Sequence, residues 1–429
     1  MLIAAITGPD LSSAERQIKL ANELCDGAEL RLDLIDKDVN VQELIKQIEG
    51  VSVLTSDNPT EELFGLEPNY LTLPWDHPFL PVKTKTKTIR AYHNFDKTPE
   101  NLDEILSRMP AADIYKMVTF AGSILDAMRM LLFAKKRTDL IGLCMGEVGE
   151  ITRILSPLVD NPLNFCAVEE RAAPGQLFAQ ELNTVYHYRS LSSKTVPYGL
   201  IGDPIVQSPS HHTHNRFFRE NGDDAVYVKM RVEKEDLPGF IPLAAEFGFK
   251  GLSVTIPHKE AVCQFVDAFQ GVAKEIGAVN TLTFQDDQIY GANTDAKAAL
   301  DVLEEEGSVK GKCVVIVGAG GAARAIAYEA VKRGALVTIA NRTAHKAEEL
   351  AKKLGCSWST LDEIPKCDLV VNTTSVANLS DSVKTSCLSS VVIGSESLFG
   401  MRMFSDQALG QFGLWGLMPI LPAARVYIY

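Results

Sequence analysis

The sequence predicts an α/β protein, with a small N-terminal (β/α)8 barrel followed by a two-domain α/β unit that contains a Rossmann nucleotide-binding domain. Three observations lead to this prediction. Short apolar runs recur through residues 1–182, and a polar, proline-containing stretch follows at 183–196. A glycine-rich turn then opens a regular alternation of strands and helices near residue 318.

The apolar runs of residues 1–182 have the spacing of strands that are separated, in several places, by helices. The runs are LIAAIT, AELRLDLI, VSVLTS, YLTLPW, KTIRAYH, DIYKMVT, LIGLCMG and NFCAV. Leu102, Ile105, Leu106 and Met109 share one stripe of a helix. The gaps after the third and fourth runs are too short for full helices. We therefore expect a trimmed barrel, shorter than the roughly 200 residues usual for this fold.

The rest of the chain divides into a linker and two further domains. Residues 183–196 have the composition of a linker, and the strand YGLIGDP opens a second α/β domain at 197–305. Residues 306–402 alternate strands and helices as in a doubly wound nucleotide-binding domain. A C-terminal helix at about 403–425 is expected to return to the second domain.

Composition excludes several classes of function. The net charge of −13 argues against a nucleic-acid or anionic-membrane partner. No apolar run reaches the roughly 18–20 residues of a membrane span, and the first residues lack the basic segment of a signal peptide. The cysteines form no CxxC pair, which favours reduced thiols and a cytoplasmic location. The histidine cluster SHHTHN is read as a loop without metal-ligand spacing, so we expect no metal.

The stretch VVIVGAGGAARAIAYEA is the clearest motif. An apolar strand runs into Gly318, Gly320 and Ala323 in GxGxxA spacing, which lets a pyrophosphate approach a helix N-terminus, although a purely structural turn is the alternative. The next strand ends in NRT instead of an acid, and Arg342 with Lys346 suits the 2′-phosphate of NADP better than NAD. The residues expected at this cofactor are Gly318, Gly320, Gly321, Ala322, Asn341, Arg342, Thr343 and Lys346.

Lys259 follows a predicted strand in GLSVTIPHKEAV, and Asp295 stands at a loop-to-helix junction in GANTDAKAAL. Either residue alone would usually be a surface group or a helix cap. A cofactor domain changes this interpretation, because hydride transfer to a ketone creates an alkoxide that needs a proton. An ammonium held by a carboxylate can supply that proton.

The motifs YGLIGDPIVQSPSHHTHN, LSVTIPHKE, GAVNT, GANTD, GAGGAAR, NRT and NTTS, in this order, resemble shikimate dehydrogenase from about residue 197 to the C-terminus. The resemblance implies catalytic roles for Lys259 and Asp295. It also implies that Ser208 and Ser210 bind the substrate carboxylate. The residues that it implies for the substrate hydroxyls are Thr255, Asn280 and Gln407.

The motifs AELRLD, IRAYHNFDKTP, ADIYKMV, MGEVGEITRI and AAPGQL resemble, in order, the type I 3-dehydroquinate dehydratase, whose fold is a (β/α)8 barrel. The resemblance implies that Lys116 forms a Schiff base with the substrate ketone and that His93 moves the protons. The other residues that it places at the substrate are Glu29, Arg31, Arg153 and Gln176.

The residues themselves support these roles. Lys116 lies in an apolar strand, where loss of water lowers the pKa of an amine and leaves it nucleophilic. The charges of ELRLD are expected to face the barrel mouth, with Glu29 and Arg31 paired and Asp33 supporting Arg31. Taken singly, Lys116 or His93 would more often be an ordinary structural residue; together with the neighbouring motifs they favour a catalytic site.

The two halves together resemble the bifunctional dehydratase–shikimate dehydrogenases, in which 3-dehydroshikimate made from 3-dehydroquinate is reduced to shikimate. Departures from the pattern leave two alternatives: a non-catalytic quinate- or shikimate-type ligand sensor, and a dehydratase with an impaired dehydrogenase half. No arginine follows the third strand, where Glu61 or Glu62 is only a candidate acid, and residues 378–405 align poorly. The other departures are Ala172 for Ser, Ser253 for Asn and Ala377 for Gly.

Overall fold

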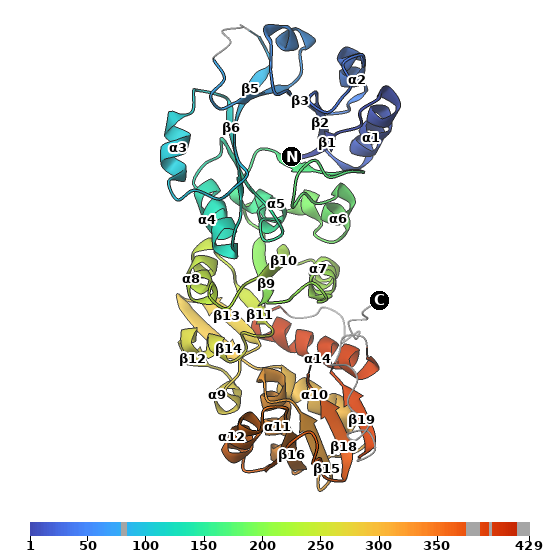
Figure 1. Cartoon of the computed structure of the whole chain (residues 1–429), viewed down its shortest axis with the longest axis vertical. Helices are drawn as coiled ribbons and strands as arrows, with labels where there is room; N and C mark the ends of the chain where they lie inside the picture. The colour runs from blue at the N-terminus through green and yellow to red at the C-terminus, as the bar shows by residue number, and fades with distance from the viewer. Residues whose placement is uncertain (79–83, 375–386, 394–396, 418–429) are drawn as a thin grey trace. The chain divides into compact units, whose positions relative to one another are not determined.

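The computed structural model divides the chain into two compact units, which are described separately (Figure 1). The residues that the structure describes are 1–78, 84–374, 387–393 and 397–417. The first unit consists of Met1–Pro197 with Asp224–Gly248, and the second consists of Tyr198–Asp223 with Phe249–Tyr429. The domain boundaries expected from the sequence stay predictions.

The first unit contains the eight parallel strands that the apolar runs predict. Their order is β7-β6-β5-β4-β3-β2-β1-β8, with β7 and β8 at the two ends. Sequential parallel neighbours in this order are typical of a (β/α)8 barrel. The strands are β1 (Leu2–Ile6), β2 (Gly27–Arg31), β3 (Val51–Thr55), β4 (Tyr70–Pro74), β5 (Lys87–Asn94), β6 (Ile114–Phe120), β7 (Leu140–Met145) and β8 (Asn164–Cys166).

Within the part of the chain that the structure describes, the connections after the third and fourth strands lack full helices, as the expected trimming requires. Only the 3₁₀ helix η1 follows β3, and the described residues between β4 and β5 contain no helix. Helix α4 begins in a capping box of Ser123 and Asp126. The remaining elements of this unit are α1 (Leu11–Leu24), α2 (Val41–Gln47), η1 (Glu61–Leu66), α3 (Leu102–Arg108), α4 (Ile124–Ala134), α5 (Ile151–Ile154), η2 (Ser156–Val159), α6 (Ala179–Thr184), η3 (Tyr188–Ser190), β10 (Ala225–Arg231) and α8 (Leu237–Phe247).

The segment expected to be a linker packs onto the end of α1 and the residues that follow it. Arg189 donates hydrogen bonds to Cys25 O and to the Asp26 carboxylate, and Tyr188 is buried. Asn183 donates to Leu24 O at 2.7 Å. Much of 183–196 therefore forms the last part of the first unit.

In the second unit, five strands of a six-stranded mixed sheet follow the order β9-β11-β13-β14-β12. The sequence cluster SHHTHN, expected as a loop, starts the helix α7 instead, so that expectation was wrong. Its buried residues alternate with exposed ones at helical spacing, a pattern that the polar letters concealed. The elements are β9 (Val196–Gly202), α7 (Ser210–Asn221), β11 (Gly251–Val254), η4 (Ala261–Phe265), β12 (Ala268–Phe269), α9 (Ala273–Ile276), β13 (Thr281–Gln285) and β14 (Gln288–Ala292).

A five-stranded parallel sheet in the order β17-β16-β15-β18-β19 completes the second unit and confirms the predicted Rossmann domain. The C-terminal helix expected at about 403–425 corresponds to α14, which begins earlier, at Leu398, and ends at Leu414. Residues 418–429, Ala377 and 378–386 lie outside the described residues. The elements are α10 (Asp295–Glu304), β15 (Cys313–Val317), α11 (Gly321–Lys332), β16 (Leu336–Ala340), α12 (Ala344–Leu354), β17 (Ser357–Ser359), β18 (Cys367–Asn372), β19 (Cys387–Val392) and α14 (Leu398–Leu414).

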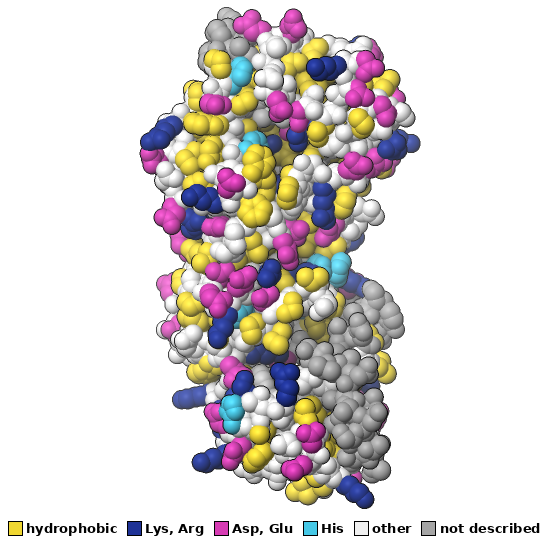
Figure 2. All heavy atoms as spheres, viewed as in Figure 1, with side chains coloured by type: hydrophobic (Ala, Val, Ile, Leu, Met, Phe, Trp, Pro, Cys, Tyr) yellow, Lys and Arg dark blue, Asp and Glu magenta, His cyan; other side chains and the backbone are white. Residues whose placement is uncertain are grey.

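The surface carries both signs of charge. On the face drawn in Figure 2, acidic and basic side chains are interspersed. No helix among the described residues is long and apolar enough to cross a membrane. In the same residues, no group of three or more His, Cys, Asp or Glu side chains could hold a metal ion.

Candidate active sites

In the first unit, Lys116 and Glu29 face the inside of the barrel. Lys116 stands opposite Ile141 in the β6–β7 register, and Glu29 stands opposite Val53 in the β2–β3 register. Ile141 and Val53 belong to the apolar cluster that fills the barrel. Because paired residues in neighbouring strands point to the same side of a sheet, both charged side chains share that side. Lys116 Nζ lies 3.5 Å from Glu29 Oε1.

The surroundings of Lys116 favour a neutral amine. The residue is only 7% exposed, and its Nζ lies 3.5 Å from the centroid of the Phe165 ring on β8. Burial lowers the pKa of Lys116; Glu29 opposes this effect, and the guanidinium of Arg31 adds to it. The site therefore offers an amine that is easier to deprotonate than an ordinary surface lysine.

His93 lies on β5 at the mouth of the barrel. Its ring is stacked on Phe95, with the ring centroids 6.0 Å apart. Desolvation of the ring and then the charge of Lys116 lower the pKa of His93 to about 4, although the residue as a whole is exposed to solvent. At neutral pH the imidazole is thus uncharged and can accept a proton.

The charges of the stretch ELRLD are paired differently from the prediction. Arg31 binds Asp33 in a two-pronged ion pair, as expected for a supporting carboxylate. Glu29 Oε1 accepts a hydrogen bond of 2.7 Å from Thr55 Oγ1 and forms an ion pair with Lys116. Thr55 is the last residue of β3, and the segment that follows it contains no arginine.

Arg153 and Gln176 are both buried beside the loops that follow β7 and β8. Arg153 Nε donates to Gly175 O at 3.0 Å, and burial lowers the pKa of Arg153 to about 10. Gly175 has φ +73°, and a Cβ there would lie 2.4 Å from Gly146 O, so the two loops meet too closely for a side chain. Gln176 Oε1 accepts from Ala172 N, which fixes the loop that was expected to close the site.

Glu61 and Glu62 remain apart from this arrangement. Both are exposed on η1, and no contact with His93 or Lys116 is described for either. The structure therefore gives no support to either residue as the missing acid.

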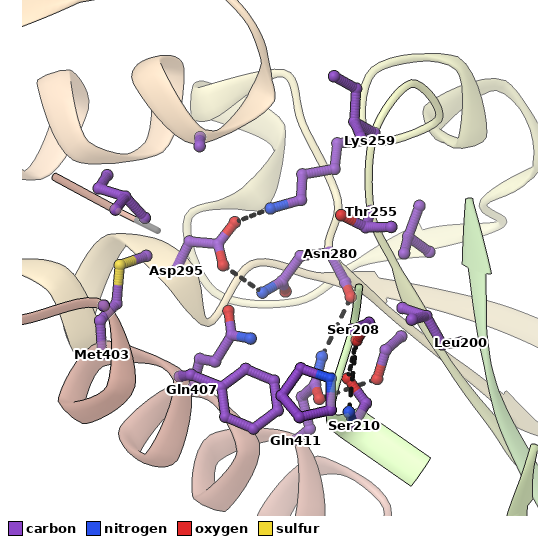
Figure 3. Close-up of a pocket in the computed structure, with 18 of the residues that line it drawn as sticks. Leu200, Ser208, Ser210, Thr255, Lys259, Asn280, Asp295, Met403, Gln407 and Gln411 are labelled. Atoms are coloured by element: carbon purple, nitrogen blue, oxygen red, sulfur yellow. Dashed lines mark hydrogen bonds and ion pairs between the residues drawn. The ribbon is translucent and has the colours of Figure 1, made fainter. Parts of the chain in front are cut away.

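In the second unit, Lys259, Asp295 and Asn280 form one connected group (Figure 3). Lys259 Nζ lies 2.6 Å from Asp295 Oδ2, and Asn280 Nδ2 donates to Asp295 Oδ1 at 2.9 Å. Asp295 is buried at the start of α10, where a carboxylate also interacts favourably with the helix dipole. The ion pair presents an ammonium to the neighbouring cavity.

That cavity has a volume of about 300 Å³ and brings the predicted substrate residues together. Ser208 and Ser210 lie at the start of α7 with their hydroxyl oxygens 2.7 Å apart. Its lining also takes in Gln411 and His214, which sequence reasoning did not single out. The residues predicted for this site that line it are Ser208, Ser210, Thr255, Lys259, Asn280, Asp295, Ala322 and Gln407.

The N-terminus of α11 fits a dinucleotide. Gly318 follows β15 with φ +120°, and no side chain caps the helix at Gly320. Free backbone N–H groups at such an end are donors suited to a pyrophosphate. A Cβ on Gly321 would lie 2.6 Å from Lys259 Cβ, so the cofactor helix comes directly against the proposed proton donor.

The loop after β16 provides the cations expected for a 2′-phosphate. Gly318 N donates to Ala340 O, which places this loop beside the glycine turn at the ends of adjacent parallel strands. Arg342 and Lys346 are exposed, and Lys346 occupies the first turn of α12, where a cation is unfavourable for the helix dipole. A bound phosphate would offset that cost. The residues present thus fit NADP.

Several residues at the two sites were missed by sequence reasoning. Thr55 and Phe165 were not singled out. For Thr55 a signal was available, because polar residues at the ends of barrel strands are candidates for catalysis. Gln411 lies one helical turn after Gln407 on α14, an i, i+4 spacing that could have identified it. His214 lies within the cluster that was taken for a loop.

Comparison with known proteins assigns the same functions to the same segments. Residues 80–193 match type I 3-dehydroquinase, residues 200–282 match the shikimate dehydrogenase substrate binding domain, and residues 299–387 match shikimate / quinate 5-dehydrogenase. Fold and sites thus define a fusion of a type I dehydroquinase with an NADP-dependent shikimate dehydrogenase.

Relatives with both halves place the chain more narrowly. A shikimate biosynthesis protein AroDE of Chlamydia pneumoniae is 34% identical over 97% of this chain and 95% of its own length. The chloroplastic bifunctional 3-dehydroquinate dehydratase/shikimate dehydrogenase of Arabidopsis thaliana is 36% identical over 68% of this chain and 53% of that protein. A shikimate dehydrogenase structure from Aquifex aeolicus is 31% identical, with a TM-score of 0.50, and covers 55% of this chain and 97% of that one. The chain belongs to the AroDE family.

Proposed function

We propose that the first unit dehydrates 3-dehydroquinate through a Schiff base on Lys116. The second unit then reduces the resulting 3-dehydroshikimate to shikimate. One observation carries this proposal: each lysine lies in its own interior site beside a carboxylate, at 3.5 Å for Lys116 and Glu29 and at 2.6 Å for Lys259 and Asp295. Ligand sensing alone would not require either amine.

The dehydratase chemistry begins at Lys116. Its neutral amine attacks the ketone carbon, and the adduct takes up one proton from solvent and loses water, which leaves an iminium. Neutral His93 then accepts the proton from the adjacent carbon, whose acidity the iminium raises, and returns it to the hydroxyl that leaves the next carbon as water. Hydrolysis of the iminium releases 3-dehydroshikimate and one proton and restores the neutral amine.

The other residues of the first site hold the substrate. Buried Arg153 suits the carboxylate, because a guanidinium forms strong paired hydrogen bonds with it. Glu29 and Arg31 suit the ring hydroxyls, one as an acceptor and the other as a donor. Gln176, fixed on the loop after β8, closes this side of the site.

In the second site, Lys259 donates the proton that the reduced oxygen needs, and Asp295 holds its ammonium in place. NADPH, when bound, supplies the hydride. Ser208 and Ser210 bind the substrate carboxylate from the start of α7. Thr255, Asn280 and Gln407 bind the hydroxyls and orient the ketone toward Lys259.

The cofactor contacts follow from the two loops described above. Gly318, Gly320, Gly321 and Ala322 bind the pyrophosphate side of NADP through the N-terminus of α11. The residues assigned to the adenosine side and its 2′-phosphate are Asn341, Arg342, Thr343 and Lys346.

The small acids of this reaction sequence are the only partners we propose. The net charge of −13 supports neither a nucleic acid nor an anionic membrane as a partner of this enzyme, which we propose to be cytoplasmic. The free cysteines among the described residues fit a reducing compartment.

Borohydride reduction in the presence of 3-dehydroquinate tests the Schiff base. We expect a covalent adduct on the peptide that carries Lys116, and none on the peptide that carries the exposed Lys87 of neighbouring β5. An active dehydratase with an unmodified Lys116 would overturn the assignment. The reduction is tested separately, by oxidation of NADPH after 3-dehydroshikimate is added.

A further inference from the structure

Gln411 is a buried polar residue on α14 that the mechanism above does not use. It is 2% exposed, and both ends of its amide are bound. Its Oε1 accepts from Ser253 Oγ at 2.9 Å, while its Nε2 lies 3.2 Å from both Asn280 O and Thr281 Oγ1. Gln411 thus ties α14 to β11 and to the start of β13, as the dashed lines in Figure 3 partly show.

These contacts continue to the proposed proton donor. Thr281 Oγ1 donates to Asn280 Oδ1 at 2.8 Å, which orients the Asn280 amide. Asn280 Nδ2 then donates to Asp295 Oδ1, and Asp295 Oδ2 binds Lys259. An unbroken series of short contacts therefore runs from Gln411 through Asn280 to Lys259.

We infer that Gln411 is a positioning residue for the reduction: by fixing Asn280 and Thr281 it aligns the Asp295–Lys259 pair with the substrate ketone. The inference rests on the reductase function proposed for the second unit. A buried hydrogen-bonding group that loses its partner carries a free-energy penalty, which favours a rearranged site, and small displacements of reacting groups are costly in rate. Ser253, which replaces the usual Asn, fixes the other end of the Gln411 amide.

Gln407, one turn earlier on the same helix, serves as the contrast. It lines the cavity and is assigned to the substrate hydroxyls, so Gln407→Ala should mainly raise the KM for 3-dehydroshikimate. Gln411 acts on the proton donor, so its loss should mainly lower kcat. A purely structural role, which fixes α14 and hence Gln407, would instead raise KM.

The test measures reduction of 3-dehydroshikimate by the full chain with Gln411→Leu. We expect kcat to fall about ten- to a hundredfold while KM changes by less than about twofold. Dehydratase activity of the same chain reports on the first unit, and the KM for NADPH reports on the folding of the second. Gly413→Ala is the matched helix control, because a Cβ there meets no atom within 4 Å.

A milder variant keeps the inference testable if Gln411→Leu disrupts the second unit. Ser253→Ala removes one hydrogen bond of Gln411, and we expect a smaller kcat loss in the same direction. Unchanged kcat in both variants, or a loss that appears in KM alone, would overturn the inference. A wild-type chain that does not oxidise NADPH would instead contradict the proposed reductase function.

Discussion

Glu29 Oε1 lies 3.5 Å from the Nζ atom of Lys116 inside the barrel. The Glu29 charge raises the pKa of Lys116 and of His93, against the larger effect of burial on both. Because dehydration needs the neutral forms of these two bases, their pKa values set the acidic limb of the rate profile.

Glu29→Gln should therefore move that acidic limb to lower pH. Removing the carboxylate leaves burial and the neighbouring cations unopposed, so both pKa values fall further below their ordinary values. The measurement is kcat/KM for dehydration as a function of pH, with the reductase activity of the same chain as the control. A limb that moves to higher pH would contradict the assigned role of Glu29.

Thr55→Val should lower the kcat/KM for dehydration of 3-dehydroquinate about tenfold. The substitution preserves the shape of the side chain but leaves Glu29 Oε1 without the 2.7 Å hydrogen bond that orients it, and hydrogen bonds to charged groups contribute about 1.5–3 kcal/mol. Thr55→Ser, which keeps the hydroxyl, is the matched control and should retain most of the rate. Equal activity of the two variants would show that the Thr55 hydroxyl is dispensable.

Arg342→Ser should raise the KM for NADPH about tenfold or more and change the use of NADH little. Arg342 is the exposed cation after β16 that suits a 2′-phosphate, which NADH lacks. Steady-state reduction of 3-dehydroshikimate with NADPH and with NADH measures the KM for each cofactor. Lys352→Ser removes an exposed charge from the last turn of α12 and should leave both KM values unchanged. An equal rise in the KM for NADH would mean that Arg342 does not recognise the 2′-phosphate.

The repeating patterns of the sequence were sufficient for the fold. Strand periodicity and glycine spacing locate the barrel strands, β15 and α11, because buried strands and a tight turn before a helix restrict the residue types allowed there. The cluster after Ser208 was misread, since its histidines and asparagine hide a helical pattern that only the buried positions of α7 reveal.

The sequence motifs singled out the proposed site residues, which stay predictions, but they did not single out Thr55 or Gln411. Lys116, His93, Lys259 and Asp295 lie in motifs with a distinct chemistry. Thr55 and Gln411 make contacts between strands or helices that are far apart in the sequence, such as the hydrogen bond between Gln411 and Ser253. The strand-end position of Thr55 and the spacing of Gln411 from Gln407 could have indicated a site, but neither signal identifies the hydrogen-bond partner until the chain is folded.

Two single-lysine variants, assayed with 3-dehydroquinate and NADPH together, test the central claim most directly. We predict that Lys116→Ala oxidises no NADPH until 3-dehydroshikimate is supplied. Lys259→Ala should accumulate 3-dehydroshikimate, an enone, while the NADPH concentration stays constant. A mixture of the two variants should restore the full conversion to shikimate. NADPH oxidation by Lys259→Ala, or enone formation by Lys116→Ala, at wild-type rates would contradict the claim.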